Sequence, residues 1–107
     1  MALVTMKELL HRAISENRGF GAFSVGNMEM VRGAVRAAEE MNTPIILQIA
    51  EVRFPNSPLE LMGPMMVQAA KEASVDIAVH LDHGLTLETV KKALELGFTS
   101  VKIGRAH

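Results

Sequence analysis

The chain has 107 residues, of which 49% are hydrophobic and 21% are charged, and its formal net charge is −1. This composition is typical of a globular domain with its own core, and the near-neutral charge excludes the basic surface of a nucleic-acid-binding protein. Cysteine is absent, which excludes disulfides and thiolate ligands or nucleophiles. No secretory signal and no apolar run near the ~20 residues of a membrane span is found, so we expect a cytoplasmic protein that does not bind membranes.

Helical and strand patterns alternate along the chain. Thr5 and Glu8 form a capping box for the first helix, Gly19 is its expected stop, and Asn27 can cap the second helix. In chain order we predict a helix over residues 6–17, a strand over 20–25, a helix over 28–41, a strand over 44–50, a helix over 58–73, a strand over 76–81, a helix over 87–96 and a strand over 99–103.

The third helix follows a polar loop over residues 51–57. Ser57 is expected to cap it, with Pro58 at its first position. Gly63 and Pro64 should interrupt or kink this helix, because proline lacks an amide proton and crowds the preceding turn.

The predicted strands are continuous apolar runs, which is typical of parallel strands covered on both faces. Two architectures fit: an open doubly wound sheet and part of a (β/α)8 TIM barrel. Neither a glycine-rich dinucleotide fingerprint nor a P-loop is present, which disfavours nucleotide binding. A full barrel takes roughly 250 residues, so residues 1–107 would form a single partial domain holding about the first half of one.

The segment HLDHG, residues 80–84, carries the strongest chemical signal. Asp82 and His83 stand where the third strand gives way to Gly84, and ligand sites in parallel α/β folds lie at this end of the strands. The aspartate can act as a base or ligand, or cap the next helix, and the imidazole can bind metal or be an ordinary polar side chain. In a regular strand the side chains of adjacent residues point to opposite faces of the sheet. Asp82 and His83 can therefore share a site only if the strand is ending there.

Other titratable residues give weaker signals. His80 should share the face of Asp82, with packing inside a barrel as its expected role, and His11 should face solvent. His107 can approach the same end of the sheet. Lys102 on the fourth strand can form a Schiff base with a ketose, which would be a metal-free aldolase mechanism.

Four stretches carry a resemblance to a known family. They are GAFSVGNME at 21–29, AAEEMNTPIIL at 37–47, VHLDHG at 79–84 and GFTSV at 97–101. Together they resemble the class II, metal-dependent ketose-bisphosphate aldolases, the group containing fructose- and tagatose-1,6-bisphosphate aldolases. The resemblance covers essentially the whole chain, but only the amino-terminal portion of a family member.

The resemblance implies the amino-terminal half of a (β/α)8 barrel, with about four parallel strands, crossover helices and a leading helix. Asp82 would be the catalytic proton donor and acceptor, and His83 would be a Zn2+ ligand. The implied reaction is reversible aldol cleavage of a ketose bisphosphate to dihydroxyacetone phosphate and an aldehyde, with zinc polarising the ketone. The chain departs from the family pattern near its end, where Gly104 and Ala106 stand in place of an acid and a serine.

We therefore expect a zinc-dependent class II aldolase-type lyase that acts on a phosphorylated ketose, with the isolated chain inactive because one ligand cannot hold a catalytic zinc. The alternative is a non-catalytic, truncated half-barrel that acts by association with another chain, since a half-barrel leaves two unpaired strand edges. A homo-oligomer or self-association is expected, and no nucleic-acid partner. A lyase that uses Lys102 is the third possibility.

Overall fold

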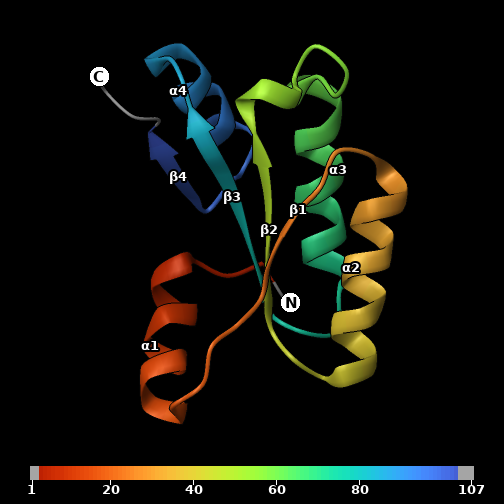
Figure 1. Cartoon of the computed structure of the whole chain (residues 1–107), viewed down its shortest axis with the longest axis vertical. Helices are drawn as coiled ribbons and strands as arrows, with labels where there is room; N and C mark the ends of the chain where they lie inside the picture. The colour runs from red at the N-terminus through yellow and green to blue at the C-terminus, as the bar shows by residue number, and fades with distance from the viewer. Residues whose placement is uncertain (1–2, 104–107) are drawn as a thin grey trace.

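The computed structural model describes residues 3–103, which form a four-stranded parallel sheet with its helices (Figure 1). The predicted alternation of helices and strands is confirmed, while Gly104, Ala106 and His107 lie outside the described residues. No helix within residues 3–103 has the length and apolarity needed to cross a bilayer. The elements are α1 (Met6–Glu16), β1 (Ala22–Ser24), α2 (Met28–Met41), β2 (Ile45–Ala50), the short 3-10 helix η1 (Glu51–Arg53), α3 (Leu59–Glu72), β3 (Ile77–Gly84), α4 (Leu87–Glu95) and β4 (Ser100–Ile103).

The strand order in the sheet is β1-β2-β3-β4, which is also the order along the chain, and every pair is parallel. A doubly wound sheet would instead reverse its order at a switch point. Consecutive order without reversal is that of a (β/α)8 barrel, so the predicted barrel segment is confirmed. The strands point to one end of the molecule, where η1 lies (Figure 1).

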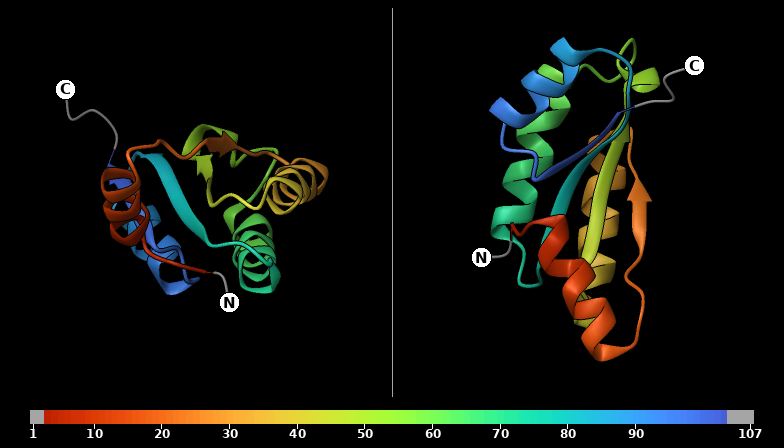
Figure 2. Two further views of the ribbon diagram at one scale, coloured as in Figure 1. Left: turned by 90° about the horizontal axis from the view of Figure 1, so that it is seen from below. Right: turned by 90° about the vertical axis from the view of Figure 1, so that its left-hand side faces the viewer.

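The two faces of the sheet are covered differently. Odd-numbered residues of β2 and β3, such as Leu47 and Leu81, pack with α2, α3 and α4 in the main core. Even-numbered residues face the other side, where Ile46 and Ala78 pack with Leu9 of α1 in a small second core. The α1 helix therefore covers only the part of this face near the amino ends of the strands (Figure 2).

The α1 helix ends earlier than predicted. Its capping box forms as expected: the Glu8 N–H donates to the Thr5 hydroxyl oxygen, and the Thr5 N–H donates to the Glu8 carboxylate. The helix stops at Asn17 and not at Gly19, because Asn17 takes the left-handed conformation with φ 54°. Asparagine tolerates this conformation better than most residues and can end a helix as glycine does.

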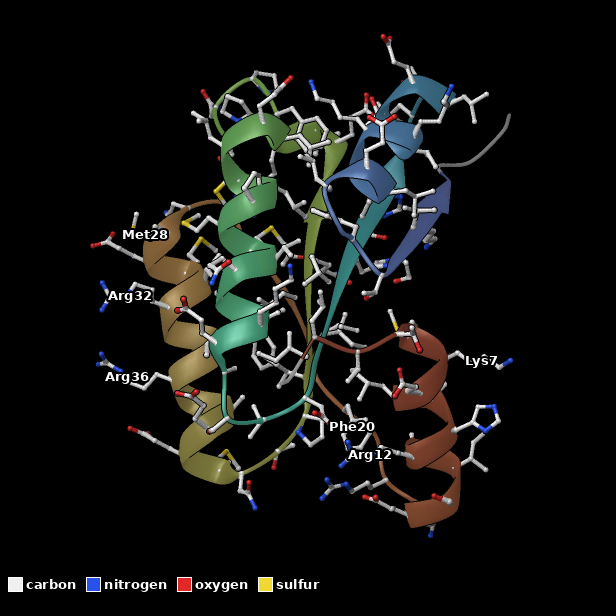
Figure 3. The ribbon with its side chains drawn as sticks, turned by 180° about the vertical axis from the view of Figure 1, so that it is seen from behind. Lys7, Arg12, Phe20, Met28, Arg32 and Arg36 are labelled. Atoms are coloured by element: carbon white, nitrogen blue, oxygen red, sulfur yellow. The ribbon has the colours of Figure 1, made fainter. Side chains whose placement is uncertain are left out.

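Arg12 fastens α1 to the residue before β3. Its guanidinium donates to the Asp76 carboxylate at 2.7 Å and lies over the Phe20 ring, 5.8 Å from the ring centroid (Figure 3). Both members of the ion pair are partly exposed, so the pair stabilises the fold by about 1 kcal/mol or less.

The α3 helix differs from the prediction at its start. It begins at Leu59, and the Ser57 hydroxyl donates to the Gly26 carbonyl instead of capping the helix. Pro64 lies inside the helix, which runs on to Glu72, close to the predicted end at residue 73, and is not interrupted there. The proline removes one backbone hydrogen bond, and burial of the apolar face of α3 in the main core outweighs that loss.

Candidate active site

The β3 strand ends at Gly84 rather than at residue 81, so Asp82 and His83 are part of it. A register shift between Leu81 and Gly84 marks a bulge against β4. His83 has a φ of 54°, in the left-handed region that residues other than glycine rarely adopt. Because a bulge interrupts the strict alternation of side chains, adjacent residues can reach a common site here.

The bulge brings the side chains of Asp82 and His83 together. His83 Nε2 lies 3.4 Å from Asp82 Oδ2. Asp82 is the more enclosed, with 19% of its side chain exposed against 48% for His83. The sequence argument required the strand to end for the two to meet, and the structure achieves the meeting within the strand.

A row of polar side chains crosses the sheet beside Asp82, on the face that α1 partly covers. Gln48 Nε2 donates to Ser24 Oγ at 3.0 Å, and His80 Nδ1 lies 2.6 Å from Ser100 Oγ. Strand register aligns all four members: Ser24, Gln48, His80 and Ser100. The carboxyl half of this face is therefore polar, in contrast to the second core under α1.

His80 is half-buried and has the clearest electrostatic signature in this row. Its pKa is lowered, chiefly because burial disfavours the charged imidazolium. The carboxylate of Asp82 raises this pKa, and the positive charge of Lys102 lowers it further. The net lowering favours the neutral imidazole, whose ring nitrogen shares a hydrogen bond with Ser100.

The segment 51–57, predicted as a polar loop, joins neighbouring strand ends at this edge. Glu51 accepts a hydrogen bond from the Leu85 backbone N–H at 2.5 Å and another from the Thr89 hydroxyl at 3.1 Å. Through Ser57 the same segment reaches the loop before α2. The sequence argument missed Glu51, because an acid after an apolar strand is an ordinary surface pattern and its partners lie far along the chain.

The side chains of residues 3–103 do not by themselves complete a metal site. An imidazole such as that of His83 is a common zinc ligand, and a catalytic zinc takes three protein ligands. Within residues 3–103, no three His, Cys, Asp or Glu side chains gather closely enough to hold a metal ion. His11 is exposed on α1, as predicted, and Lys102 is exposed on β4, unlike the buried lysine that a Schiff-base mechanism uses.

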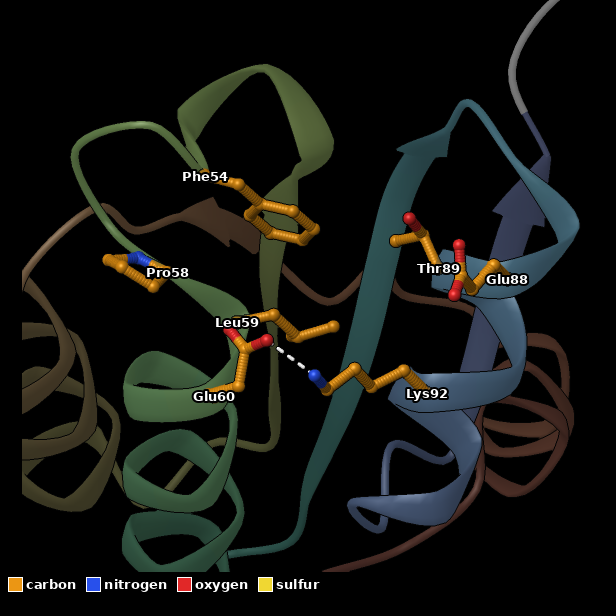
Figure 4. A pocket seen from close by; sticks show the side chains of 7 residues that line it. All are labelled: Phe54, Pro58, Leu59, Glu60, Glu88, Thr89 and Lys92. Atoms are coloured by element: carbon orange, nitrogen blue, oxygen red, sulfur yellow. Dashed lines mark hydrogen bonds and ion pairs between the residues drawn. The ribbon is translucent and has the colours of Figure 1, made fainter.

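A cavity of about 370 Å³ lies between the amino-terminal turns of α3 and α4 (Figure 4). An ion pair between Glu60 and Lys92 crosses it, and the hydrogen bond from Lys92 lowers the pKa of Glu60. The cavity lies between helices, whereas Asp82 and His83 lie at the end of β3 and do not line it.

Comparisons with known proteins agree with this arrangement. The family described as "Fructose-bisphosphate aldolase class-II" matches residues 4–107. The fructose-bisphosphate aldolase of Thermus caldophilus is 47% identical over 105 residues, which are 98% of this chain and 34% of that protein. The sulfofructosephosphate aldolase of Alkalicoccus urumqiensis is 41% identical over 101 residues, 94% of this chain and 35% of that protein.

The likeness extends to solved structures. The crystal structure of the YdjI aldolase from Escherichia coli K12 aligns with a TM-score of 0.88 at 30% identity, over 92% of this chain and 39% of that chain. The chain thus spans about a third of the length of the curated relatives it matches. The family match covers nearly all of the sequence and confirms the resemblance seen in its motifs. The chain therefore belongs to the class II fructose-bisphosphate aldolase family.

Proposed function

We propose that this chain contributes the acid/base residue and one metal ligand of a class II aldolase. The reaction is reversible aldol cleavage of a ketose bisphosphate, fructose or tagatose 1,6-bisphosphate, to dihydroxyacetone phosphate and an aldehyde. The observation that best supports this proposal is the 3.4 Å approach of Asp82 Oδ2 to His83 Nε2 at the carboxyl end of β3. Since the relatives are named for more than one phosphorylated sugar, the class of substrate has firmer support than the particular sugar.

Asp82 is the proposed proton acceptor in the cleavage direction. Aldol cleavage needs a base for the hydroxyl proton on the carbon that becomes the aldehyde, and an acid returns a proton in the reverse direction. Asp82 is partly enclosed, which limits competing water, yet it remains accessible from the open face of the sheet. Burial lowers the pKa of its neighbour His80, which disfavours a second charge beside Asp82.

His83 is the proposed zinc ligand. Zn2+, when bound, supplies Lewis-acid polarisation of the substrate ketone. The described residues contain one suitably placed imidazole, so further ligands would come from outside residues 3–103. We therefore propose that residues 1–107 by themselves have no aldolase activity.

The test uses both the isolated chain and a chimera. In the chimera, residues 4–103 replace the matching part of the Thermus caldophilus relative, which supplies the remaining parts of the barrel. We expect the isolated chain to show no chelator-sensitive cleavage and the chimera to be active. Asp82→Asn in the chimera should lower kcat by about 100-fold or more. His83→Ala should remove zinc from the chimera.

Matched controls are available for both substitutions. Glu88→Gln changes an exposed carboxylate at the start of α4, and His11→Gln changes an exposed imidazole on α1. Neither should alter kcat or zinc content of the chimera. Full activity of the Asp82→Asn chimera would contradict the assigned role, and zinc-dependent cleavage by the isolated chain would contradict its proposed inactivity.

A second candidate function is association through the sheet edges. Within residues 3–103, β1 and β4 each pair with a strand on one side only, and such edges can pair with another chain. Light scattering at micromolar concentration tests this: a defined oligomer supports association, whereas a dispersed, cooperatively folding monomer contradicts it.

A further inference from the structure

We infer that Glu51 is a positioning residue for the pair formed by Asp82 and His83. Its carboxylate holds the turn that follows His83, and this keeps the imidazole beside the aspartate. The inference rests on the function proposed for that pair. It adds a residue from a different strand end, which acts on the pair through the turn between β3 and α4.

The carboxylate of Glu51 bonds two points of the chain after His83. Glu51 Oε1 accepts from the Leu85 N–H at 2.5 Å, and Oε2 accepts from the Thr89 hydroxyl at 3.1 Å. Leu85 is the second residue after His83, and Thr89 lies in the first turns of α4. A carboxylate has two acceptor oxygens at a fixed separation, so Glu51 holds the turn and the start of α4 as one unit.

The backbone conformation of His83 needs support from its surroundings. A φ of 54° at a non-glycine residue persists only where the surrounding structure imposes it. On one side, Gly84 is packed so closely that an added Cβ would lie 3.0 Å from Leu81 Cδ2 and 3.1 Å from Val90 Cγ2. On the other side, the bond from Leu85 to Glu51 fixes the path of the chain. The backbone after His83 is thus held from two directions.

The backbone of Glu51 is itself held by hydrogen bonds. Its carbonyl accepts from the Phe54 N–H at 3.0 Å, which closes the η1 turn. Farther along this segment, the Ser57 hydroxyl donates to the Gly26 carbonyl. The carboxylate therefore projects from a backbone that is tied to the neighbouring loop, and it can transmit that restraint to the end of β3.

Leu85 is largely exposed, so a positioning role of Glu51 can be separated from a role in the stability of the fold. If Glu51 is shortened, water can hydrogen-bond the freed Leu85 N–H, so the fold should survive. Water does not fix the direction of the chain, so His83 should lose its preference for the left-handed conformation.

The test is heteronuclear NMR of the full 107-residue chain with Glu51→Ala, Glu51→Gln and the control Glu88→Ala. The readouts are the His83 Cα and Cβ shifts, its HN–Hα coupling and the Leu85 amide shift. In Glu51→Ala, we expect the His83 shifts to leave the left-handed range and the Leu85 amide proton to move upfield. Glu51→Gln should rescue these signals in part, because its amide oxygen can still accept from Leu85. Glu88→Ala should match the unmodified chain.

Zinc binding by the chimera described above provides the second readout, because the isolated chain has a single candidate ligand. We expect the dissociation constant for zinc to rise about tenfold when the chimera carries Glu51→Ala, the effect typical of losing support around a metal ligand. If zinc binding by the chimera does not depend on His83 while the backbone signals of the 107-residue chain still depend on Glu51, the proposed ligand role fails and the positioning role stands.

Unchanged His83 signals and an unchanged zinc response in Glu51→Ala would overturn the inference, as would an equal effect of Glu88→Ala. The methyl signals of Leu9 and Ala78, in the second core, report whether each variant is folded. If Glu51→Ala does not fold, Glu51→Gln decides the question: intermediate His83 signals support the inference, and signals identical to those of the unmodified chain overturn it.

Discussion

The two faces of the sheet hold different kinds of residue in the same strands. On the face under α2, α3 and α4, side chains such as Leu47, Val79 and Leu81 are fully buried. On the other face, Gln48 and Asp82 are only half-buried and polar. Successive side chains of a strand point to opposite faces, so each strand can stabilise the fold at one set of positions and present chemical groups at the next. At the bulge near the end of β3 this alternation is broken, and the adjacent side chains of Asp82 and His83 meet.

The largest expected difference between the two faces comes from creating a cavity under the face that α2, α3 and α4 cover. Leu81→Ala should lower the free energy of unfolding by about 2–5 kcal/mol, because it removes a fully buried side chain from the main core. Gln48→Ala, on the neighbouring strand and the opposite face, should change it by less than about 1 kcal/mol. Urea unfolding followed by circular dichroism measures both. Equal decreases in the free energy of unfolding for the two variants would contradict the claim that the helix-covered face provides most of the stability.

A substitution at Gly84 tests the packing at the bulge near the end of β3. An alanine Cβ there would press on Leu81 and Val90, so Gly84→Ala should destabilise the fold by about 1–3 kcal/mol through overpacking. Gly33→Ala is the matched control, because Gly33 lies inside α2 with no atom within 4 Å of the added Cβ. That control should stabilise the fold by about 0.5–1 kcal/mol. A neutral or stabilising effect of Gly84→Ala would contradict tight packing around Gly84.

The attachment of α1 gives a smaller effect. Asp76→Asn removes the charged partner of Arg12, in a pair of which both members are partly exposed. The helix is otherwise held by the small second core, so we expect its amides to exchange up to about fivefold faster, equivalent to about 1 kcal/mol. Amides of α2, which packs in the main core, should be unaffected. Equal acceleration in both helices would mean that α1 does not open separately from the rest.

The general fold could be predicted because its signals are local. Apolar strand runs and capping residues located each α-helix and strand of the described residues, whereas η1 was predicted as loop. A barrel segment and a doubly wound sheet share this alternation of helices and strands. Only the order of strands in the sheet separates them, and order depends on contacts between distant residues. The stop expected at Gly19 and the cap expected at Ser57 were wrong for the same reason, since each was judged by local preference and the tertiary structure uses other residues there.

The candidate site could be located from sequence but not built from it. The position of Asp82 and His83 at a strand end was evident, whereas their approach depends on a bulge and on a left-handed histidine. A histidine gives no sequence signal for that conformation as a glycine would. Glu51 could not be identified because its partner Leu85 lies 34 residues farther on.

His80 gives the smallest expected effect and probes the polar face directly. Its pKa is lowered in the folded chain, mainly by burial, so between that value and the unfolded value of about 6.5 the unfolded chain binds more protons. The resulting stabilisation is present above pH 6.5 and is lost as the pH falls through the folded pKa. Stability should therefore rise with pH across this window, with Asp82 moderating the shift and Lys102 adding to it.

The measurement is the free energy of unfolding in urea at pH values on both sides of that window. His80→Gln keeps a side chain able to hydrogen-bond Ser100 but removes the titration, so it should flatten the part of the pH dependence that His80 contributes. His11→Gln, which alters an exposed imidazole, should leave the slope unchanged. If His80→Gln retains the full slope, or the slope has the opposite sign, His80 is not the half-buried neutral group described on this face. A flattened slope together with an unchanged free energy at high pH would show that the polar face carries its own pH response while the opposite face sets overall stability.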